Sequence, residues 1–372
     1  MYPNLYYAFK DLFGLELGFL KMFQSFGLFV ALAFILGSYA FSLELKRKEK
    51  DGLLKAVEVS VTAKKTVTWM DYLLSLILGF IIGYKLFFIL FNFDAFLENT
   101  QHALLSLKGN AIGGVIGGGL AVLLKFREAR QLDKTEFTAS TVLVHPYEHI
   151  GAMTTIAAIS GLIGAKIFHN LENWSDFMLD PVGSLLSFSG LTMYGGLIVG
   201  ALAVISYAHK HKINLKHLVD ASAPGLMLAY GIGRIGCQVA GDGDWGIDNT
   251  SPKPGILGFL PDWFWSYSYP HNVLNEHLNA PVFPTPLYEA LICIALFFVL
   301  WGIRKKISAP ATLFCIYLVL NGVERFFIEK IRINTQYPIF GHGITQAEII
   351  SSLLIVTGIT GIFWFKKKSV RA

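Results

Sequence analysis

The chain has 372 residues, of which 53% are hydrophobic, 14% aromatic and only 15% charged, and its formal net charge is +5. A soluble domain carries roughly 25% charged residues, so this composition excludes an ordinary soluble fold and indicates a protein of the lipid bilayer. The basic residues gather in connections between apolar runs, which indicates anchoring at a membrane face rather than nucleic-acid binding.

Nine apolar runs approach the roughly 20 residues that a helix needs to cross a hydrocarbon core. They lie at about 22–43, 72–92, 111–125, 150–169, 190–208, 219–240, 286–303, 311–330 and 346–365. We therefore predict an all-α integral membrane protein, a polytopic bundle of about nine spans in one transmembrane domain, 1–372. The first run has no small-residue cleavage site, so we expect an anchor rather than a signal peptide.

The distribution of lysine and arginine predicts the orientation of these spans. Most of the 31 lie in the connections after the first, third, fifth and seventh runs and in the C-terminal tail. Basic loops resist translocation, so the N-terminus is expected outside and the C-terminus in the cytoplasm. The long polar connection at 241–285 is then extracytoplasmic. Its aromatic stretch "PDWFWSYSYP" suits the headgroup level and is a candidate to cover a site.

The stretch "YGIGRIGCQVAGDGDWG" at 230–246 contains the pattern G-x-G-x-x-G twice. A dinucleotide fingerprint needs a preceding strand and a βαβ unit, whereas these copies fall in a predicted span and in a turn. The run "DGDWGID" lacks the distal glutamate of a calcium loop. The three cysteines also lack the spacing of a metal site. We therefore predict neither a metal nor a cofactor.

Two arginines lie within predicted spans, where a charge is costly and usually functional. Arg234 is flanked by glycines, and Arg325 is followed by Glu329 at i+4 and Arg332 at i+7, which predicts one polar face on one helix. One interpretation is a buried pair of Arg325 with Glu329 that serves structure alone. A second buried arginine favours an anion-binding site instead, because a planar guanidinium suits a phosphate.

In a membrane, the abundant phosphate belongs to a lipid headgroup. Asp242 and Asp244 follow the span that carries Arg234, on the predicted outer side. The sequence thus predicts a headgroup site at the outer leaflet.

Five blocks carry a resemblance to a known family. They are "GLIGAKIFHNLENW" at 161–174, "GLTMYGGLIVGAL" at 190–202, "GRIGCQVAGDGDWG" at 233–246, "FPTPLYEA" at 283–290 and "LVLNGVERFFIEKIR" at 318–332. Together they resemble the prolipoprotein diacylglyceryl transferases, bacterial inner-membrane enzymes that begin lipoprotein maturation. The resemblance covers about 150–365. Because that family generally has seven spans, 65–140 is interpreted as an inserted hairpin of two more.

The resemblance implies transfer of diacylglyceryl from phosphatidylglycerol to the lipobox cysteine of a prolipoprotein signal peptide, leaving glycerol phosphate. It implies a site toward the outer leaflet of the bacterial inner membrane, with phosphatidylglycerol, the signal peptide and membrane lipids as partners. Arg234 and Arg325 match the family's two essential arginines and would hold the phosphate. Glu329 would orient Arg325, and Asp242 or Asp244 would replace the acidic residue of the turn.

The chain departs from the family pattern at the position of a candidate base. Tyr194 stands where the family usually has a histidine, and a tyrosine of ordinary pKa near 10 is a poor resting base. Tyr194 is then expected to hydrogen-bond the headgroup, while a thiol beside two guanidiniums ionises without a dedicated base. Further departures are Phe26, Cys237, Phe283 and Pro286.

The matched blocks also place Gly195, Gly196, Lys166, Tyr288 and Glu289 at the substrate. Two of these have alternative interpretations: Lys166 extends along a span end toward the interface, and Glu289 stabilises a helix N-terminus. Two other functions remain as alternatives, an anion or lipid transporter and a phosphatidylglycerol-dependent transferase with another acceptor.

Overall fold

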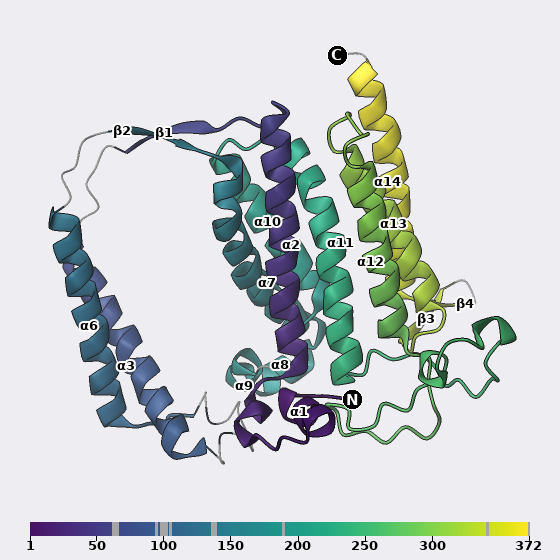
Figure 1. The fold of residues 1–372 in the computed structure, drawn as a ribbon, viewed down its shortest axis with the longest axis horizontal. Coiled ribbons are helices and arrows are strands. Elements are labelled where there is room, and N and C mark those ends of the chain that lie inside the picture. Colours follow the sequence, from purple (N-terminus) through teal and green to yellow (C-terminus); the bar gives the residue numbers. More distant parts are fainter. Residues whose placement is uncertain are drawn as a thin grey trace. The chain divides into compact units, whose positions relative to one another are not determined.

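The computed structural model describes residues 1–61, 67–93, 96, 103, 106–134, 140–187, 190–339 and 342–370. Its long elements are helices, with two short antiparallel ribbons (Figure 1). The chain forms two compact units. The first contains Met1–Lys55, Pro146–Thr154 and Ile205–Ala372, and the second contains Ala56–His145 and Thr155–Val204.

The first unit is built on five long helices. They are α2 (Ser25–Lys50), α11 (Leu215–Ala240), α12 (Thr285–Ile303), α13 (Thr312–Glu329) and α14 (Gln346–Val370). The unit also contains α1 (Leu5–Phe13), the ribbon β3 (Gln336–Ile339) with β4 (His342–Thr345), and four 3₁₀ turns, Gly18–Met22, Pro146–His149, Gly255–Leu257 and Asp262–Phe264. Helix α11 is central, because it packs against α2, α12 and α13.

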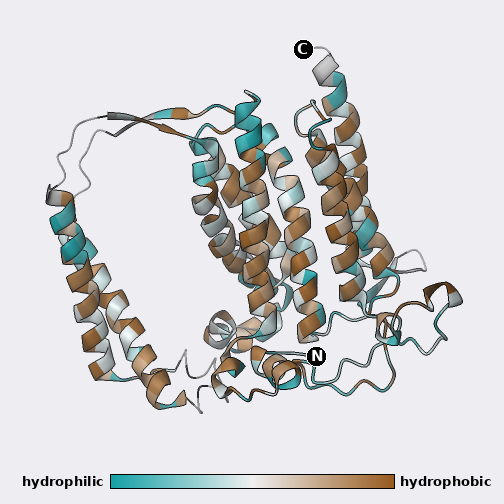
Figure 2. Cartoon of the chain, viewed as in Figure 1, coloured by the Kyte–Doolittle hydropathy of each residue, from teal (hydrophilic) through white to brown (hydrophobic). Residues whose placement is uncertain are grey.

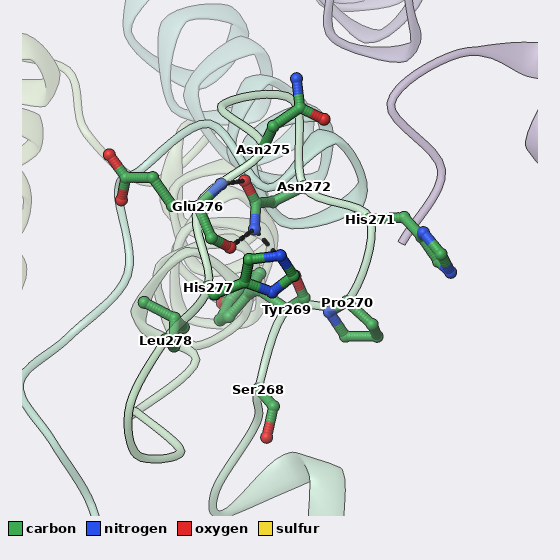
Figure 3. A pocket seen from close by; sticks show the side chains of 9 residues that line it. All are labelled: Ser268, Tyr269, Pro270, His271, Asn272, Asn275, Glu276, His277 and Leu278. Atoms are coloured by element: carbon green, nitrogen blue, oxygen red, sulfur yellow. Dashed lines mark hydrogen bonds between the residues drawn. The ribbon is translucent and has the colours of Figure 1, made fainter.

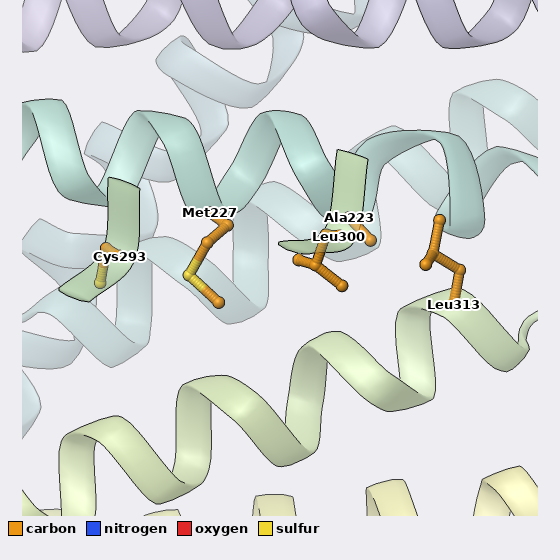
Figure 4. Close-up of a cluster of buried hydrophobic side chains, with 5 residues drawn as sticks. All are labelled: Ala223, Met227, Cys293, Leu300 and Leu313. Atoms are coloured by element: carbon orange, nitrogen blue, oxygen red, sulfur yellow. The ribbon is translucent and has the colours of Figure 1, made fainter. Parts of the chain in front are cut away.

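Small and apolar side chains hold this bundle together. At the crossing of α2 and α11, a Cβ added to Gly37 would lie 3.0 Å from the carbonyl oxygen of Gly225, so the two backbones approach closely. Between α11, α12 and α13, the buried core consists of Ala223, Met227, Cys293, Leu300 and Leu313 (Figure 4). Cys293 thus contributes to the packing of this core.

A buried ionic group joins one end of α11 and α12 to α2; we name Glu44, Arg47, Lys48, Asp220 and Arg304 the Glu44 cluster. The Glu44 carboxylate accepts from Arg47 at 3.0 Å and from Arg304 at 3.1 Å. Asp220 lies 3.8 Å from the Lys48 ammonium and accepts the backbone N–H groups of Ala311 and Phe314, at the start of α13. These contacts fix the ends of four helices.

In the second unit, α3 (Trp69–Phe91) and α6 (Ala111–Lys134) pack side by side. Their interface is lined by Gly79, Gly83, Gly113 and Gly117, where an added Cβ would collide with the facing backbone. Strand β1 (Val57–Val61) pairs with β2 (Ser140–Val144), with Val57 opposite Val144. The predicted segment 65–140 therefore contains a glycine-packed helical hairpin flanked by a ribbon, although 65–66, 94–95, 97–102, 104–105 and 135–139 lie outside the described residues.

Helices α7 (Ile150–Glu172) and α10 (Met193–Lys210) each begin in one unit and end in the other, and α8 (Trp174–Leu179) and α9 (Pro181–Leu186) lie between them in the chain. Where α7 and α10 pack, a Cβ on Gly196 would lie 3.0 Å from the carbonyl oxygen of Gly161. The glycine block at 190–202 therefore serves close helix packing.

The helical fold class is confirmed, since each of the nine predicted runs falls on a helix, and apolar residues cover these helices over most of their length (Figure 2). Within the described ranges, five segments are long and apolar enough to cross a membrane, namely Ser25–Lys50, Trp69–Phe91, Pro146–Glu172, Thr285–Ile303 and Gln346–Lys367. Helix α13 falls short because it carries Glu324, Arg325 and Glu329. The count of nine spans and their orientation stay predictions.

Candidate active site

The turn after α11 brings the side chain of Asp244 back to α11, where it contacts Arg234. The helix ends at Ala240, and the next residue, Gly241, adopts left-handed backbone angles (φ 66°) and donates its N–H to the Cys237 carbonyl at 2.9 Å. Gly243 follows with φ 93°, a second conformation that favours glycine. The chain thereby reverses, and the Asp244 carboxylate forms an ion pair with Arg234.

Two hydrogen bonds to or from its backbone attach this turn to two other helix ends. Thr285, the first residue of α12, donates its hydroxyl to the Asp244 carbonyl at 2.8 Å. Ile247 donates its N–H to the carbonyl of Ile331 at 2.9 Å, just after α13. Three segments distant in the sequence therefore meet at the ends of α11, α12 and α13.

Glu289, in the second turn of α12, is the centre of this meeting point, and its side chain is 0% exposed. One carboxylate oxygen lies 2.7 Å from Nε of Arg234 and 3.5 Å from Nη1 of Arg325, and it accepts the Tyr230 hydroxyl at 2.7 Å. The other oxygen accepts from Arg332 at 3.1 Å. Because its partners are side chains, Glu289 acts here as an ion-pair hub rather than as a helix cap.

The end of α13 supplies the remaining contacts. Arg325 lies 3.0 Å from Glu329, and Asn334 donates to the other oxygen of Glu329 at 2.6 Å. The expectation that Arg332 continues this helical face is wrong, because α13 ends at Glu329. Arg332 reaches the site from the segment after the helix, where it pairs with both Asp244 and Glu289.

We name this group the Glu289 cluster; it consists of Arg234, Asp244, Glu289, Arg325, Glu329 and Arg332. Its three guanidiniums face three carboxylates, so the formal charges cancel. Burial by itself raises the pKa of Asp244, but the guanidiniums of Arg234 and Arg332 lower it below the ordinary value of an aspartate. The resident carboxylates therefore compete with any incoming anion for these guanidiniums.

Asp242 lies beside this cluster rather than in it. Its carboxylate accepts the N–H of Asp244 at 3.4 Å, and burial followed by the charge of Asp244 raises its pKa. Ligand atoms of Cys237, Asp242 and Asp244 lie within 4.8 Å of one another, close enough to surround a cation. The two arginines that hold Asp244 oppose a further positive charge at that position.

The long loop after the turn packs onto the start of α12. Tyr288 donates its hydroxyl to the Phe264 carbonyl at 2.7 Å, so the predicted substrate residue Tyr288 contacts the loop. Tyr269 is buried with Trp245 and Val282, and donates to Gln238 of α11 at 2.7 Å. A cavity of about 370 Å³ lies within the loop, lined by residues 268–272 and 275–278, with Asn272 bridging Tyr269 and Glu276 (Figure 3).

Four predicted site residues, Lys166, Tyr194, Gly195 and Gly196, lie in the second unit. Lys166, on α7, has its ammonium 3.5 Å from the carbonyl oxygen of Gly190. Gly195 and Gly196 lie in the first turn of α10 and pack against α7. The predicted set thus draws on both units, and the roles of these four residues stay predictions.

Sequence reasoning missed several residues that the structure joins to the site. Tyr230 lies one turn before Arg234 on α11, and the Arg234 guanidinium carbon is 5.3 Å from the centre of its ring. Thr285 and Asn334 act through hydrogen bonds that no spacing reveals. Glu324 directly precedes Arg325, and its position signals a buried acid within a span.

The fold and site together define a helical membrane protein that buries an arginine–carboxylate cluster where three helix ends meet. The sequence model of the family described as prolipoprotein diacylglyceryl transferase matches residues 129–364, which contain the whole Glu289 cluster. The chain therefore belongs to the prolipoprotein diacylglyceryl transferase family.

Individual relatives have modest identity and extensive coverage. Three bacterial phosphatidylglycerol–prolipoprotein diacylglyceryl transferases illustrate this. The protein from Dehalococcoides mccartyi is 27% identical over 61% of this chain and 80% of its own length. The protein from Leptospira interrogans is 28% identical over 59% and 80%, respectively. The protein from Chlorobaculum tepidum is 31% identical over 58% and 72%. Helix α3 lies outside the family match.

Proposed function

We propose that the protein transfers the diacylglyceryl group of phosphatidylglycerol to the lipobox cysteine of prolipoproteins, the first step of lipoprotein maturation. The observation that carries this proposal is the Glu289 cluster: three arginines, with side chains at most 18% exposed, within the region matched by the family. The names of the relatives support phosphatidylglycerol and a prolipoprotein as substrates. In this proposal the site faces the outer leaflet of the bacterial inner membrane. The distribution of lysine and arginine supports nine spans with the N-terminus outside.

The chemistry requires stabilisation of a departing phosphate. The cysteine sulfur attacks the glyceryl carbon, an S–C bond forms and the C–O bond to phosphate breaks, leaving glycerol phosphate. The phosphate gains negative charge as it departs, and fixed guanidiniums in a water-poor site stabilise that charge best. Arg234 and Arg325 are assigned to hold the phosphate, with Glu329 orienting Arg325.

Because the cluster is balanced in charge, the phosphate enters by replacing a carboxylate. Asp244 is the candidate, because it lies in a turn and its side chain is 32% exposed, whereas the side chains of Glu289 and Glu329 are 0% exposed. Its two oxygens contact Arg234 and Arg332, much as two oxygens of a phosphate would. Release of Asp244 frees donors for the headgroup while Glu289 keeps the arginines in place.

The test uses the purified full-length protein in vesicles. Phosphatidylglycerol labelled in its diacylglyceryl part is supplied with a lipobox peptide, and a peptide with serine at the cysteine position serves as the control. Label on the cysteine peptide alone is the expected result. Label on a different acceptor would support another phosphatidylglycerol-dependent transferase, and movement of label across the vesicle without transfer would support a transporter.

A further inference from the structure

The structure buries one acid that its arginines leave unpaired. Glu324 lies in α13 next to Arg325 and is 5% exposed, yet neither carboxyl oxygen has a hydrogen-bond partner among the described residues. In native proteins nearly all buried polar groups are hydrogen-bonded, so each exception calls for an explanation.

Charged and titratable groups on three helices act on this carboxyl. Glu289 and Cys293 act from α12, Arg234 and Tyr230 from α11, and Arg325 and Tyr317 from α13, together with Arg332 beyond the end of α13. Glu324 therefore lies at the edge of the Glu289 cluster.

The charge balance determines the resting form of Glu324. Three guanidiniums are already matched by Asp244, Glu289 and Glu329, so a fourth ionised carboxylate would be buried without a partner, which is strongly unfavourable. A protonated carboxyl avoids that penalty and carries an O–H donor. With this charge balance, Glu324 thus holds a proton with no acceptor among the described residues.

We propose that Glu324 is the proton-transfer group of the reaction, an inference that rests on the proposed function. As the C–O bond breaks, Glu324 donates its proton to the departing phosphate oxygen, which would otherwise leave with a second negative charge. In the same displacement the S–C bond forms, and the cysteine thiol gives its proton to Glu324, which is thereby restored. The proton passes from sulfur to phosphate, Glu324 ends as it began, and no further reactant is needed.

The other acids near the site suit this role less well. Asp244, Glu289 and Glu329 are each already paired with an arginine. Asp242 hydrogen-bonds the Cys237 thiol and a backbone N–H. Among the acids of the cluster and its edge, Glu324 alone combines burial with two oxygens that lack a hydrogen bond, within the part of the chain that the structure describes.

The test compares Glu324→Gln and Glu324→Asp with the wild type in the vesicle assay, across a pH series. Glutamine has the shape of the protonated acid but no transferable proton, so we expect kcat to fall at least about 100-fold, the lower range for general acid–base catalysis, with little change in KM for phosphatidylglycerol. Aspartate should recover part of that loss with a displaced pH profile. The matched control is Glu44→Gln, which removes an equally buried carboxyl from the Glu44 cluster and should keep wild-type kcat per folded protein.

Infrared spectroscopy of the wild type gives a readout independent of turnover. We expect a protonated-carboxyl band at neutral pH that is lost in Glu324→Gln. If the glutamine variant does not fold, the same band should be displaced in Glu324→Asp. Absence of that band, or a Glu324→Gln enzyme with wild-type kcat at every pH, would overturn the proposal while leaving the transferase intact. If the wild type transfers no label, the proposed function fails instead, and the infrared band still decides the protonation of Glu324.

Discussion

Two buried ionic clusters lie at opposite ends of the same helices, and they differ in how fully their atoms are bonded. Asp220 of the Glu44 cluster accepts two backbone N–H groups of α13, and the Glu44 carboxylate accepts from two arginines. At the Glu289 cluster, Nη1 of Arg325, one oxygen of Glu329 and both oxygens of nearby Glu324 make no hydrogen bond among the described residues.

That difference separates a structural ion cluster from one prepared for a ligand. Glu289 and Arg304 are fifteen positions apart along one helical path, so the two clusters lie about 22 Å from each other. In the Glu44 cluster, the hydrogen bonds hold helix ends together. In the Glu289 cluster, Nη1 of Arg325 makes no hydrogen bond among the described residues, and the Asp244 carboxylate is proposed to exchange with a phosphate. A phosphate site requires such donors.

The largest expected effect comes from the arginines. Arg234→Gln or Arg325→Gln should lower kcat for diacylglyceryl transfer by about 100- to 1,000-fold, the loss typical of removing a donor to a developing anion. Arg304→Gln is the matched change in the Glu44 cluster and should affect the thermal midpoint rather than kcat. The measurements are labelled transfer in vesicles and lipidation in cells. Normal lipidation with either cluster arginine replaced would refute the phosphate assignment.

Sequence alone could predict much of this cluster, because charges inside apolar helices are rare and visible. Arg234, Arg325 and Glu329 follow from that rule, and Asp244 from its place after the span. Helical spacing places Arg332 on the face of Arg325 and Glu329, but α13 ends at Glu329. The bridge that Arg332 makes with Gly246 instead depends on a tertiary turn, which spacing does not reveal. The central role of Glu289 also escaped sequence reasoning, because an acid near a helix start is equally typical of capping.

The next prediction concerns stability as well as activity. Glu289→Gln leaves three arginines without their shared carboxylate, and Glu44→Gln leaves two in the same condition. Removing one partner of a buried ion pair costs about 3–5 kcal/mol, so both variants should lose comparable unfolding free energy. Only Glu289→Gln should also lose transfer activity when rates are normalised to folded protein. Denaturation in detergent measures the unfolding free energy, and the vesicle assay measures the transfer rate. Equal rates in the two variants would remove the distinction between the clusters.

A smaller effect is expected at the exchangeable carboxylate. Asp244→Asn removes the charge that competes with phosphate, so KM for phosphatidylglycerol should fall several-fold, by analogy with charge-assisted contacts being about twice as strong as neutral ones. The low pKa of Asp244 means that its ion pairs stabilise the protein above the ordinary aspartate value near 4 and that this stability is lost as pH falls through its folded pKa. In Asp244→Asn, the thermal midpoint should therefore lack the part of its decrease at acid pH that comes from protonation of Asp244. An increased KM would instead make Asp244 a direct binder of the substrate.

The smallest effect is expected at Tyr194, which belongs to neither cluster and lies at the start of α10. If Glu324 takes the proton of the thiol, as proposed, the Tyr194 hydroxyl only hydrogen-bonds the headgroup. Tyr194→Phe should then cost about fivefold in kcat/KM, the equivalent of one hydrogen bond of about 1 kcal/mol. Tyr207→Phe provides the matched control near the other end of the same helix, where the hydroxyl lies 2.9 Å from Nδ1 of His149. Complete loss of transfer in Tyr194→Phe alone would assign the thiol's base to that hydroxyl, and the Glu289 cluster would then bind the phosphate without being sufficient for the chemistry.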